Sequence, residues 1–263
     1  MKNYALITGA SKGIGLEIAK LFAKDGYSLI LVARSIDLLM QIKHTFEEEY
    51  HINVKVIEKD LSDLSAAKQI YEEVKKENLQ VDYLVNNAGF GDYGYFLDAN
   101  IDKHVKMVNL NITTLIELCY YFGNDMKYKK FGRILNVGSI ASFFPGPLMA
   151  SYYATKAFVL SFSEALKKEL EHTGVSVSVL CPGTTATNFF DNANATTEKT
   201  DLLKKMHPAS PADVAKYGYQ KMLKKKTIII YGFKNKTAIF MNRLISHKVA
   251  RNMVYRIQKK RKG

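Results

Sequence analysis

Residues 4–15 read Tyr-Ala-Leu-Ile-Thr-Gly-Ala-Ser-Lys-Gly-Ile-Gly, an apolar run that leads directly into three glycines in the spacing Gly-x-x-x-Gly-x-Gly. The run at 4–8 predicts a buried strand, and residues 14–24 have the periodicity of a helix. Glycines between a strand and a helix let the backbone turn sharply and approach a pyrophosphate, whose charge is stabilised by the free N–H groups and the dipole at the helix start. A tight turn that only packs the strand on the helix would use the same glycines. The strand before the turn and the helix after it favour nucleotide binding.

Apolar runs and helical stretches alternate from this turn to about residue 230. The expected strands are residues 4–8, 28–33, 53–57, 83–86, 133–137, 175–180 and 227–230. The expected helices are residues 14–24, 35–49, 62–76, 103–127 and 151–171. Several strands are continuously apolar, which is typical of a parallel sheet with helices on both faces. We therefore expect an α/β fold, a doubly wound parallel sheet of about seven strands, with its ligand site at the carboxyl ends of the strands.

Length and composition bound the domain organisation. The chain has 263 residues, of which 47% are hydrophobic, enough for one large core. We expect a single domain over 1–263, with a main part at 1–231 and a C-terminal extension at 232–263. The apolar stretch at the N-terminus is shorter than a signal peptide, and no apolar run reaches the about 20 residues that cross a bilayer. Cys119 and Cys181 lack metal-ligand spacing, so we expect no metal site and a reduced, cytoplasmic compartment.

Positive charge is concentrated toward the C-terminal end. The chain has 38 Lys and Arg residues against 25 Asp and Glu, and residues 199–263 contain 18 of the basic residues but only 2 of the acidic ones. Within this part, residues 236–258 predict a basic amphipathic helix. Such a helix can pack over a substrate site or form a subunit contact, bind an anionic membrane surface, or dock an acidic carrier protein or a coenzyme A thioester. No zinc-finger, helix-turn-helix or interleaved aromatic motif accompanies the charge, so we expect no specific nucleic-acid partner.

Five motifs follow one another along the chain: the glycine turn, Asn86-Asn87-Ala88-Gly89, Ser139, Tyr152-x-x-x-Lys156 and Pro182-Gly183. In this order and spacing, the sequence strongly resembles the short-chain dehydrogenase/reductase family over about residues 2–230. The resemblance implies a Rossmann-type sheet, a nicotinamide cofactor, and hydride transfer to or from a carbonyl–carbinol pair. It also implies a homodimer or homotetramer formed through the helices that contain Asn111 and Tyr152.

The end of the second strand indicates which nicotinamide cofactor is bound. An NAD-binding Rossmann fold places Asp or Glu there, next to the ribose 2′-hydroxyl, whereas this chain has Ala33 followed by Arg34. A guanidinium can bind a 2′-phosphate in a forked arrangement, and a carboxylate would repel it. Lys12 in the glycine turn adds a second cation if the family geometry holds, so we expect NADP(H). Alternatively, both cations are solvated surface charges.

The motifs together define an expected cofactor site. Its residues are Gly9, Ser11, Lys12, Gly13, Ile14, Gly15, Arg34, Asp60, Leu61, Asn87, Ala88, Gly89, Tyr152, Lys156, Pro182, Gly183, Thr185 and Thr187. The resemblance implies that Asp60 meets the adenine amino group, although its position before a helix also suits an N-cap or turn residue. It further implies that Thr185 and Thr187 hold the carboxamide and the phosphates. Residues 188–207, which follow, are expected to form a mobile lid.

Tyr152 and Lys156 are four residues apart on one expected helix and therefore share a face. A nearby ammonium favours the phenolate and lowers the pKa of a tyrosine toward the range that general acid–base catalysis needs. We expect Tyr152 to protonate the carbonyl oxygen during reduction, and the resemblance implies that Lys156 also holds the nicotinamide ribose. Ser139, at the end of a strand, can donate a hydrogen bond to the substrate oxygen. Asn111, favoured over Asn109 by its spacing to Ser139, matches the family's asparagine that links the lysine through water to solvent.

Apolar residues flank the expected reaction centre on two segments. They are Phe90, Tyr93, Tyr95 and Phe96 on the first segment, and Phe143, Phe144, Leu148 and Met149 on the second. They suggest an apolar pocket, although core packing explains such residues equally well. We expect an NADPH-dependent oxidoreductase that reduces a ketone, aldehyde or 3-oxoacyl group to an alcohol. The alternative is an NADPH-binding sensor, a cytoplasmic protein whose basic helix engages a partner or attaches peripherally to a membrane.

Overall fold

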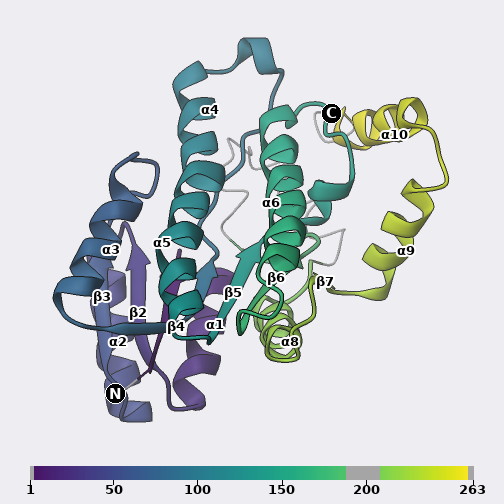
Figure 1. Ribbon diagram of the computed structural model, residues 1–263. Helices are drawn as coiled ribbons and strands as arrows, with labels where there is room; N and C mark the ends of the chain where they lie inside the picture. Colours follow the sequence, from purple (N-terminus) through teal and green to yellow (C-terminus); the bar gives the residue numbers. More distant parts are fainter. Residues whose placement is uncertain (1–2, 188–207, 260–263) are drawn as a thin grey trace.

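The apolar runs of the sequence form one parallel sheet in the computed structural model, which describes residues 3–187 and 208–259 (Figure 1). Its strands are β1 (Asn3–Thr8), β2 (Ser28–Ala33), β3 (Val54–Glu58), β4 (Gln80–Asn86), β5 (Gly132–Val137), β6 (Val175–Cys181) and β7 (Ile228–Ile230). They are hydrogen-bonded in the order β3-β2-β1-β4-β5-β6-β7, and every pairing is parallel. The expected doubly wound sheet of seven strands is confirmed. The direction of winding reverses between β1 and β4, which opens a crevice at their carboxyl ends.

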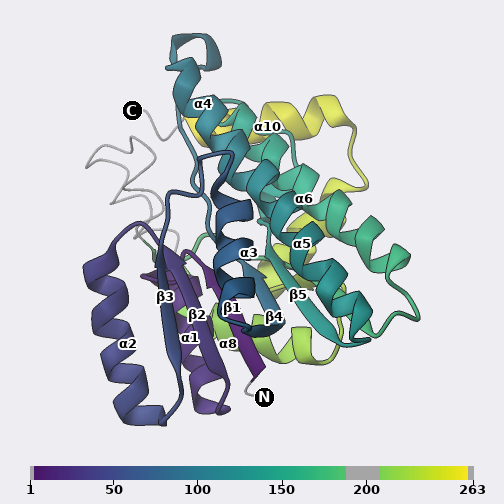
Figure 2. The ribbon, with the colours of Figure 1, turned by 60° about the vertical axis from the view of Figure 1, so that its left-hand side comes forward.

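Helices cover both faces of this sheet (Figure 2). They are α1 (Gly13–Lys24), α2 (Ile36–Tyr50), α3 (Ala66–Lys76), α4 (Ile101–Val108), α5 (Thr114–Tyr128), α6 (Ala150–Glu169), α8 (Pro211–Leu223), α9 (Phe233–Asn242) and α10 (His247–Lys259), with short turns η1 (Phe96–Asp98), η2 (Asn109–Thr113) and η3 (Ile140–Phe143). One core packs α1, α2 and α8 on one face, and the other packs α3, α5 and α6 on the opposite face. Because successive strand side chains point to opposite faces, β1 contributes Leu6 to one core and Ile7 to the other.

The helix expected at 103–127 is interrupted. Residues Ile101–Val108 and Thr114–Tyr128 are α-helical, but Asn109–Thr113 between them form a π-helical turn. Apolar periodicity does not reveal such a turn, because the apolar face continues through it. Single π turns are frequent at functional sites, and this one contains Asn111.

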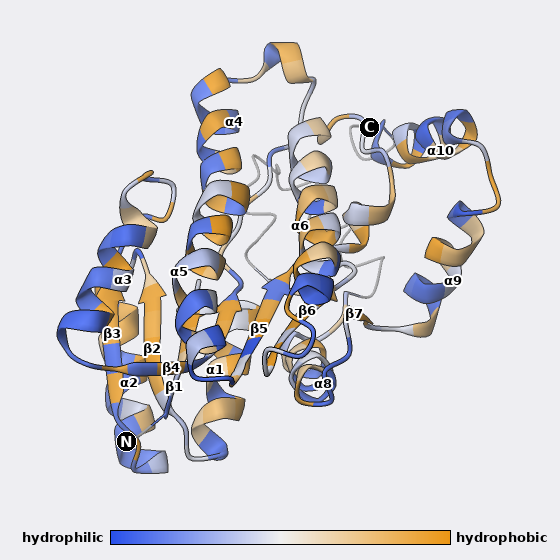
Figure 3. Ribbon diagram, viewed as in Figure 1, coloured by the Kyte–Doolittle hydropathy of each residue, from blue (hydrophilic) through white to orange (hydrophobic). Residues whose placement is uncertain are grey.

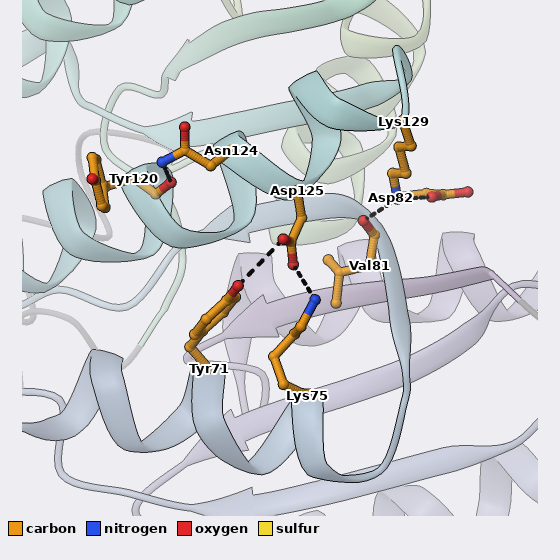
Figure 4. Close-up of polar contacts among 8 residues, drawn as sticks. All are labelled: Tyr71, Lys75, Val81, Asp82, Tyr120, Asn124, Asp125 and Lys129. Carbon is orange, nitrogen blue, oxygen red and sulfur yellow. Dashed lines mark hydrogen bonds and ion pairs between the residues drawn. The ribbon is translucent and has the colours of Figure 1, made fainter.

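Ion pairs hold α3 and α5 against one another and against the sheet (Figure 4). Asp82 on β4 is 1% exposed and forms an ion pair with Lys129, which follows α5. On the outer side, Asp125 of α5 accepts a hydrogen bond from Tyr71 at 3.2 Å and pairs with Lys75 at 3.1 Å, both from α3. A buried charge that loses its partner costs several kcal/mol. The ion pair between Asp82 and Lys129 therefore fixes the C-terminal end of α5, the helix that follows the π turn.

The single basic helix expected at 236–258 is divided into α9 and α10, which we call the C-terminal arm (residues 233–259). Ser246 explains the division, because its side-chain oxygen accepts the N–H of Val249 at 3.4 Å and so caps the start of α10. In Figure 1 the arm runs from β7 to the upper end of α6. Among the residues that the structure describes, no helix is both long and apolar enough to cross a membrane.

Candidate active site

A cavity of about 1130 Å³ lies at the carboxyl ends of the strands. It extends from Arg34 and Asp60, past the glycine turn and Tyr152, to the C-terminal arm. All the expected cofactor and catalytic residues line it except Gly15 and Asn111. Pockets for single small ligands usually measure about 300–1,000 Å³. The cavity is therefore large enough for a dinucleotide together with part of a substrate.

The glycine turn forms a cradle that side chains would fill. Gly9 and Gly13 have φ values of +64° and +59°, in the left-handed region that favours glycine. A Cβ atom on Gly13 would lie 3.0 Å from the Cγ2 atom of Thr187, across the cavity. Gly15 lies beneath the turn, where a Cβ atom would clash with the carbonyl oxygen of Gly9 and the side chain of Asn87. The open turn at the start of α1 fits a pyrophosphate, and Gly15 supports that turn without facing the cavity.

Charged groups gather at the end of the cavity next to β2 and β3. Burial raises the pKa of Asp60, but hydrogen bonds from Ser62 and the charges of Arg34 and Lys106 outweigh burial and lower that pKa below its usual value. The Oδ1 atom of Asp60 accepts the N–H of Ser62 at 2.9 Å, so Asp60 is a turn residue as well as a cavity residue. Neither Arg34 nor Lys12 forms an ion pair with an acidic residue in the described part of the chain. Both cations remain available to an anionic ligand.

The expected reaction centre is assembled at the start of α6, where Tyr152 and Lys156 line the cavity and are both largely buried. The Nζ atom of Lys156 lies 5.9 Å from the centre of the Tyr152 ring and donates a hydrogen bond to the carbonyl oxygen of Val137 at 2.8 Å. Ser139 follows β5, hydrogen-bonds Tyr152, and accepts the N–H of Ala141 at 3.1 Å. The tyrosine, the serine and the lysine are thus held close together by α6 and the end of β5.

Burial determines the protonation states of this pair. It raises the pKa of Tyr152 above its usual value, against the lowering effect of the hydrogen bond from Ser139. It also lowers the pKa of Lys156 to about 8. The expected lowering of the Tyr152 pKa is not seen in this arrangement, because the removal of a phenolate from water is the largest effect on that pKa. At neutral pH Tyr152 is a neutral phenol, the form that can donate a proton.

Asn111 lies behind the cavity rather than in its wall. Its Nδ2 atom donates to the carbonyl oxygen of Phe90 at 3.0 Å and to the Oγ1 atom of Thr155 at 3.1 Å, and its Oδ1 atom accepts the N–H of Phe90 at 3.2 Å. A Cβ atom on Gly89 would lie 3.0 Å from this Oδ1 atom and 3.4 Å from the Nζ atom of Lys156. The π turn therefore directs Asn111 toward Lys156 and ties the loop after β4 to α6.

The loop after β6 closes the cavity opposite the glycine turn. The Oγ1 atom of Thr185 donates to the carbonyl oxygen of Gly183 at 3.0 Å, and the N–H of Thr187 donates to the carbonyl oxygen of Thr185 at 2.8 Å. A Cβ atom on Gly183 would clash with the side chain of Asn235 on α9. The loop is thus packed against the C-terminal arm. The expected lid at 188–207 lies outside the described residues.

The C-terminal arm packs over the cavity, which was one of the alternatives for the basic helix. Its lining residues, none of which was predicted as a site residue, are Ala238, Met241, Asn242, Ile245, Ala250, Met253, Val254, Ile257 and Gln258. The side chain of Gln258 is buried and donates to the hydroxyl of Tyr153 at 3.0 Å, and its backbone carbonyl accepts the hydroxyl of Tyr93 at 2.7 Å. In the sequence, the neutral side chain of Gln258 among the cations of α10 was the feature that could have indicated this contact. These bonds join the arm to the segment after β4 and to the start of α6.

The eight apolar residues expected around the substrate divide into three groups. Phe90, Phe144 and Met149 line the cavity. Tyr95 and Phe96 are 43% and 49% exposed, because the chain leaves the cavity wall at η1. The remaining three, Tyr93, Phe143 and Leu148, support the wall through hydrogen bonds to Gln258, Asn242 and Gly94.

Comparisons with known proteins agree with this geometry. A family model described as short chain dehydrogenase matches residues 3–198. An NADP-dependent 3-hydroxy acid dehydrogenase of Schizosaccharomyces pombe is 32% identical over 260 residues, which cover 96% of each chain. A 7beta-hydroxysteroid dehydrogenase of Mediterraneibacter gnavus is 28% identical over 238 residues, 90% of this chain and 89% of that protein. A solved structure from a study of 7beta-hydroxysteroid dehydrogenase stereoselectivity superposes with a TM-score of 0.86 at 25% identity and covers 96% of each chain.

Proposed function

This chain belongs to the short-chain dehydrogenase/reductase family, whose members are oxidoreductases acting on hydroxyl or carbonyl groups, and we propose that it uses NADPH to reduce an apolar ketone, aldehyde or 3-oxoacyl compound. The observation that carries this proposal is one continuous cavity with three differently lined parts. Lys12 and Arg34 line one end, Ser139 and Tyr152 the middle, and the apolar side of the arm the other end.

The cofactor end of the cavity supports NADPH over NADH. Arg34 follows β2 where a carboxylate would recognise the ribose 2′-hydroxyl of NADH, and its planar guanidinium suits a phosphate instead. Lys12 adds a second cation at the turn. When bound, the nicotinamide supplies the hydride that reduces the carbonyl carbon. The likeness to an NADP-dependent dehydrogenase favours the same cofactor.

Tyr152 acts in this proposal as the general acid. Burial keeps it protonated, so it can transfer its phenolic proton to the carbonyl oxygen as that oxygen gains negative charge. Ser139 is hydrogen-bonded to Tyr152 and donates to the same oxygen, which stabilises the developing charge. Lys156, whose pKa is about 8, is charged at neutral pH and stabilises the phenolate that remains. Asn111 holds α6 through Thr155, the neighbour of Lys156, without lining the cavity.

The substrate end of the cavity favours a hydrophobic carbonyl compound. Phe144 and Met149 line it from the connection before α6, Met241 from α9 and Ile257 from α10. Burial of apolar substrate surface against such side chains stabilises binding by about 25 cal/mol per Å². An extended hydrocarbon skeleton next to the carbonyl is therefore the substrate class that we propose.

Two measurements test the proposal in sequence. Nicotinamide fluorescence is followed while the protein is titrated with NADPH and, separately, with NADH, and tighter binding of NADPH is expected. NADPH oxidation is then measured with small polar carbonyls and with hydrophobic ketones and 3-oxoacyl esters, of which only the hydrophobic compounds should be turned over. Preference for NADH would refute the cofactor assignment. Binding of NADPH without turnover of any carbonyl would favour a sensor.

We also propose that copies of the chain associate through the helices that contain Asn111 and Tyr152. Val105 and Val108 near the π turn, Tyr120 on α5 and Phe158 on α6 are at least 36% exposed. Exposed apolar side chains gathered on neighbouring helices are typical of subunit contacts. Light scattering should show a dimer or a tetramer, and Tyr120→Lys should dissociate it.

A further inference from the structure

The C-terminal arm leaves part of its apolar surface uncovered. On α10, Ala250 and Gln258 face inward and are buried, whereas the neighbouring stripe formed by Val249, Met253 and Ile257 is 47%, 50% and 55% exposed. These three residues are spaced by four and therefore share one side of the helix. On α9 and the turn after it, Phe233, Phe240 and Leu244 are 84%, 60% and 66% exposed. We call these six side chains the outer apolar face.

The charge of the arm has a single sign. Residues 233–259 contain seven Lys and Arg residues and no Asp or Glu. All seven are exposed, and none forms an ion pair with an acidic residue in the described ranges 3–187 and 208–259. Figure 3 shows hydrophobic and hydrophilic positions side by side on both helices. A partner that covers this surface must therefore offer hydrocarbon and negative charge together.

The outer apolar face is continuous with the lining of the cavity. Met253 and Ile257 line the cavity and are also about half exposed. Met241 of α9 combines the same two properties, with 52% of its surface exposed. An apolar path thus leads from the outside of the arm to the substrate end of the cavity.

We propose that the C-terminal arm docks on an anionic lipid surface, with its apolar side chains among the acyl chains and its cations at the headgroups. Helices with one apolar side and one Lys- and Arg-rich side bind membranes in this orientation. A symmetric contact between two copies would bring the cations of both arms together, whereas an anionic lipid surface presents hydrocarbon and negative charge side by side. If the chain has the proposed function, docking also brings the substrate end of the cavity to the membrane, from which a hydrophobic carbonyl compound can enter.

The test is cosedimentation of the full chain with phosphatidylcholine vesicles and with vesicles that also contain phosphatidylglycerol. Binding to the anionic vesicles only is expected, and it should weaken at high salt. Each cation near an anionic surface strengthens binding about fivefold, so Lys248→Gln combined with Arg251→Gln should weaken it about 30-fold. Phe240→Ser combined with Leu244→Ser should weaken it at least about tenfold. None of these four residues lines the cavity, so reduction of a soluble carbonyl should be unchanged.

A matched charge control is Lys224→Gln combined with Lys226→Gln. Both lysines are exposed and precede the amino end of β7, whereas the arm follows its carboxyl end, and this variant should bind vesicles like the unmodified chain. The proposal would be overturned if this control variant lost vesicle binding as strongly as the variant with the Lys248 and Arg251 substitutions. Equal binding of the unmodified chain to neutral and anionic vesicles would overturn it as well. So would dissociation of an oligomer by the Phe240 and Leu244 substitutions, because the face would then be covered by a second copy. A Tyr152→Phe variant separates the two proposals, since it should lose turnover and keep vesicle binding.

Discussion

Replacing Arg34 by Leu removes the cation that we assign to the 2′-phosphate. Arg34 lines the cavity directly after β2, and its charge helps to lower the pKa of Asp60, with which it forms no ion pair. A hydrogen bond to a charged group contributes about 1.5–3 kcal/mol, which corresponds to a factor of about 12 to 150 in affinity. NADPH should therefore bind about 12- to 150-fold more weakly to Arg34→Leu. Lys12 remains at the turn, so binding should be weakened rather than abolished.

NADH provides the internal control for this prediction, because it has no 2′-phosphate. Its affinity should change by less than about twofold, a few tenths of a kcal/mol, which is the range for surface substitutions away from special features. Lys24→Leu, at the far end of α1, controls for loss of one positive charge and should affect neither cofactor. Dissociation constants are measured by nicotinamide fluorescence at one salt concentration. Equal weakening of NADPH and NADH by Arg34→Leu would refute the assignment of Arg34 and return it to the role of a surface charge.

Four further predictions concern the reaction centre and its supports. Tyr152→Phe should lower kcat by a factor of about 10² to 10⁴, the usual contribution of a general acid, with NADPH affinity unchanged in the fluorescence titration. Burial lowers the pKa of Lys156 to about 8, so its ammonium is present below that pH and is lost above it. The kcat for reduction should therefore fall as pH rises through about 8, and a kcat that stays constant from pH 6 to 10 would contradict this. Gln258→Leu should raise KM for a hydrophobic carbonyl more than it changes kcat, since it removes the side-chain hydrogen bond that ties the arm to Tyr153; a KM restored by Gln258→Asn, whose shorter side chain cannot keep that bond, would contradict this. Lys129→Met leaves Asp82 buried without its ion-pair partner and should lower the free energy of unfolding by about 3–5 kcal/mol, as measured by urea denaturation. The double variant with Asp82→Leu should recover most of this loss.

Local patterns predicted the parts of the site that depend on neighbouring residues in the chain. The glycine spacing and the residues around it predicted the turn between β1 and α1, because conformation at Gly9 and Gly13 depends on the absence of a side chain. The spacing of Tyr152 and Lys156 predicted a shared helix face, which α6 confirms. The residue after β2 could be identified because a parallel sheet brings all carboxyl ends to one edge.

Other properties of the site depend on contacts that local patterns do not contain. The sequence suggested a lowered pKa for Tyr152, but the structure buries that phenol and raises its pKa. The π turn at Asn111 interrupts a stretch with continuous helical periodicity. Both corrections have the same origin, because desolvation and helix irregularities are set by packing between segments.

The sequence by itself determined the parallel α/β sheet, the family and the residues that line the cofactor end of the cavity, because alternating periodicity and motif spacing act over short distances along the chain. Only the tertiary structure decided where the C-terminal arm lies, which of its residues line the cavity, and how burial shifts the pKa values of Tyr152 and Lys156. Gln258 and Tyr153 are 105 residues apart and meet through a hydrogen bond of 3.0 Å. Such a contact is formed by the packing of α10 against the start of α6, and no local sequence pattern records that packing.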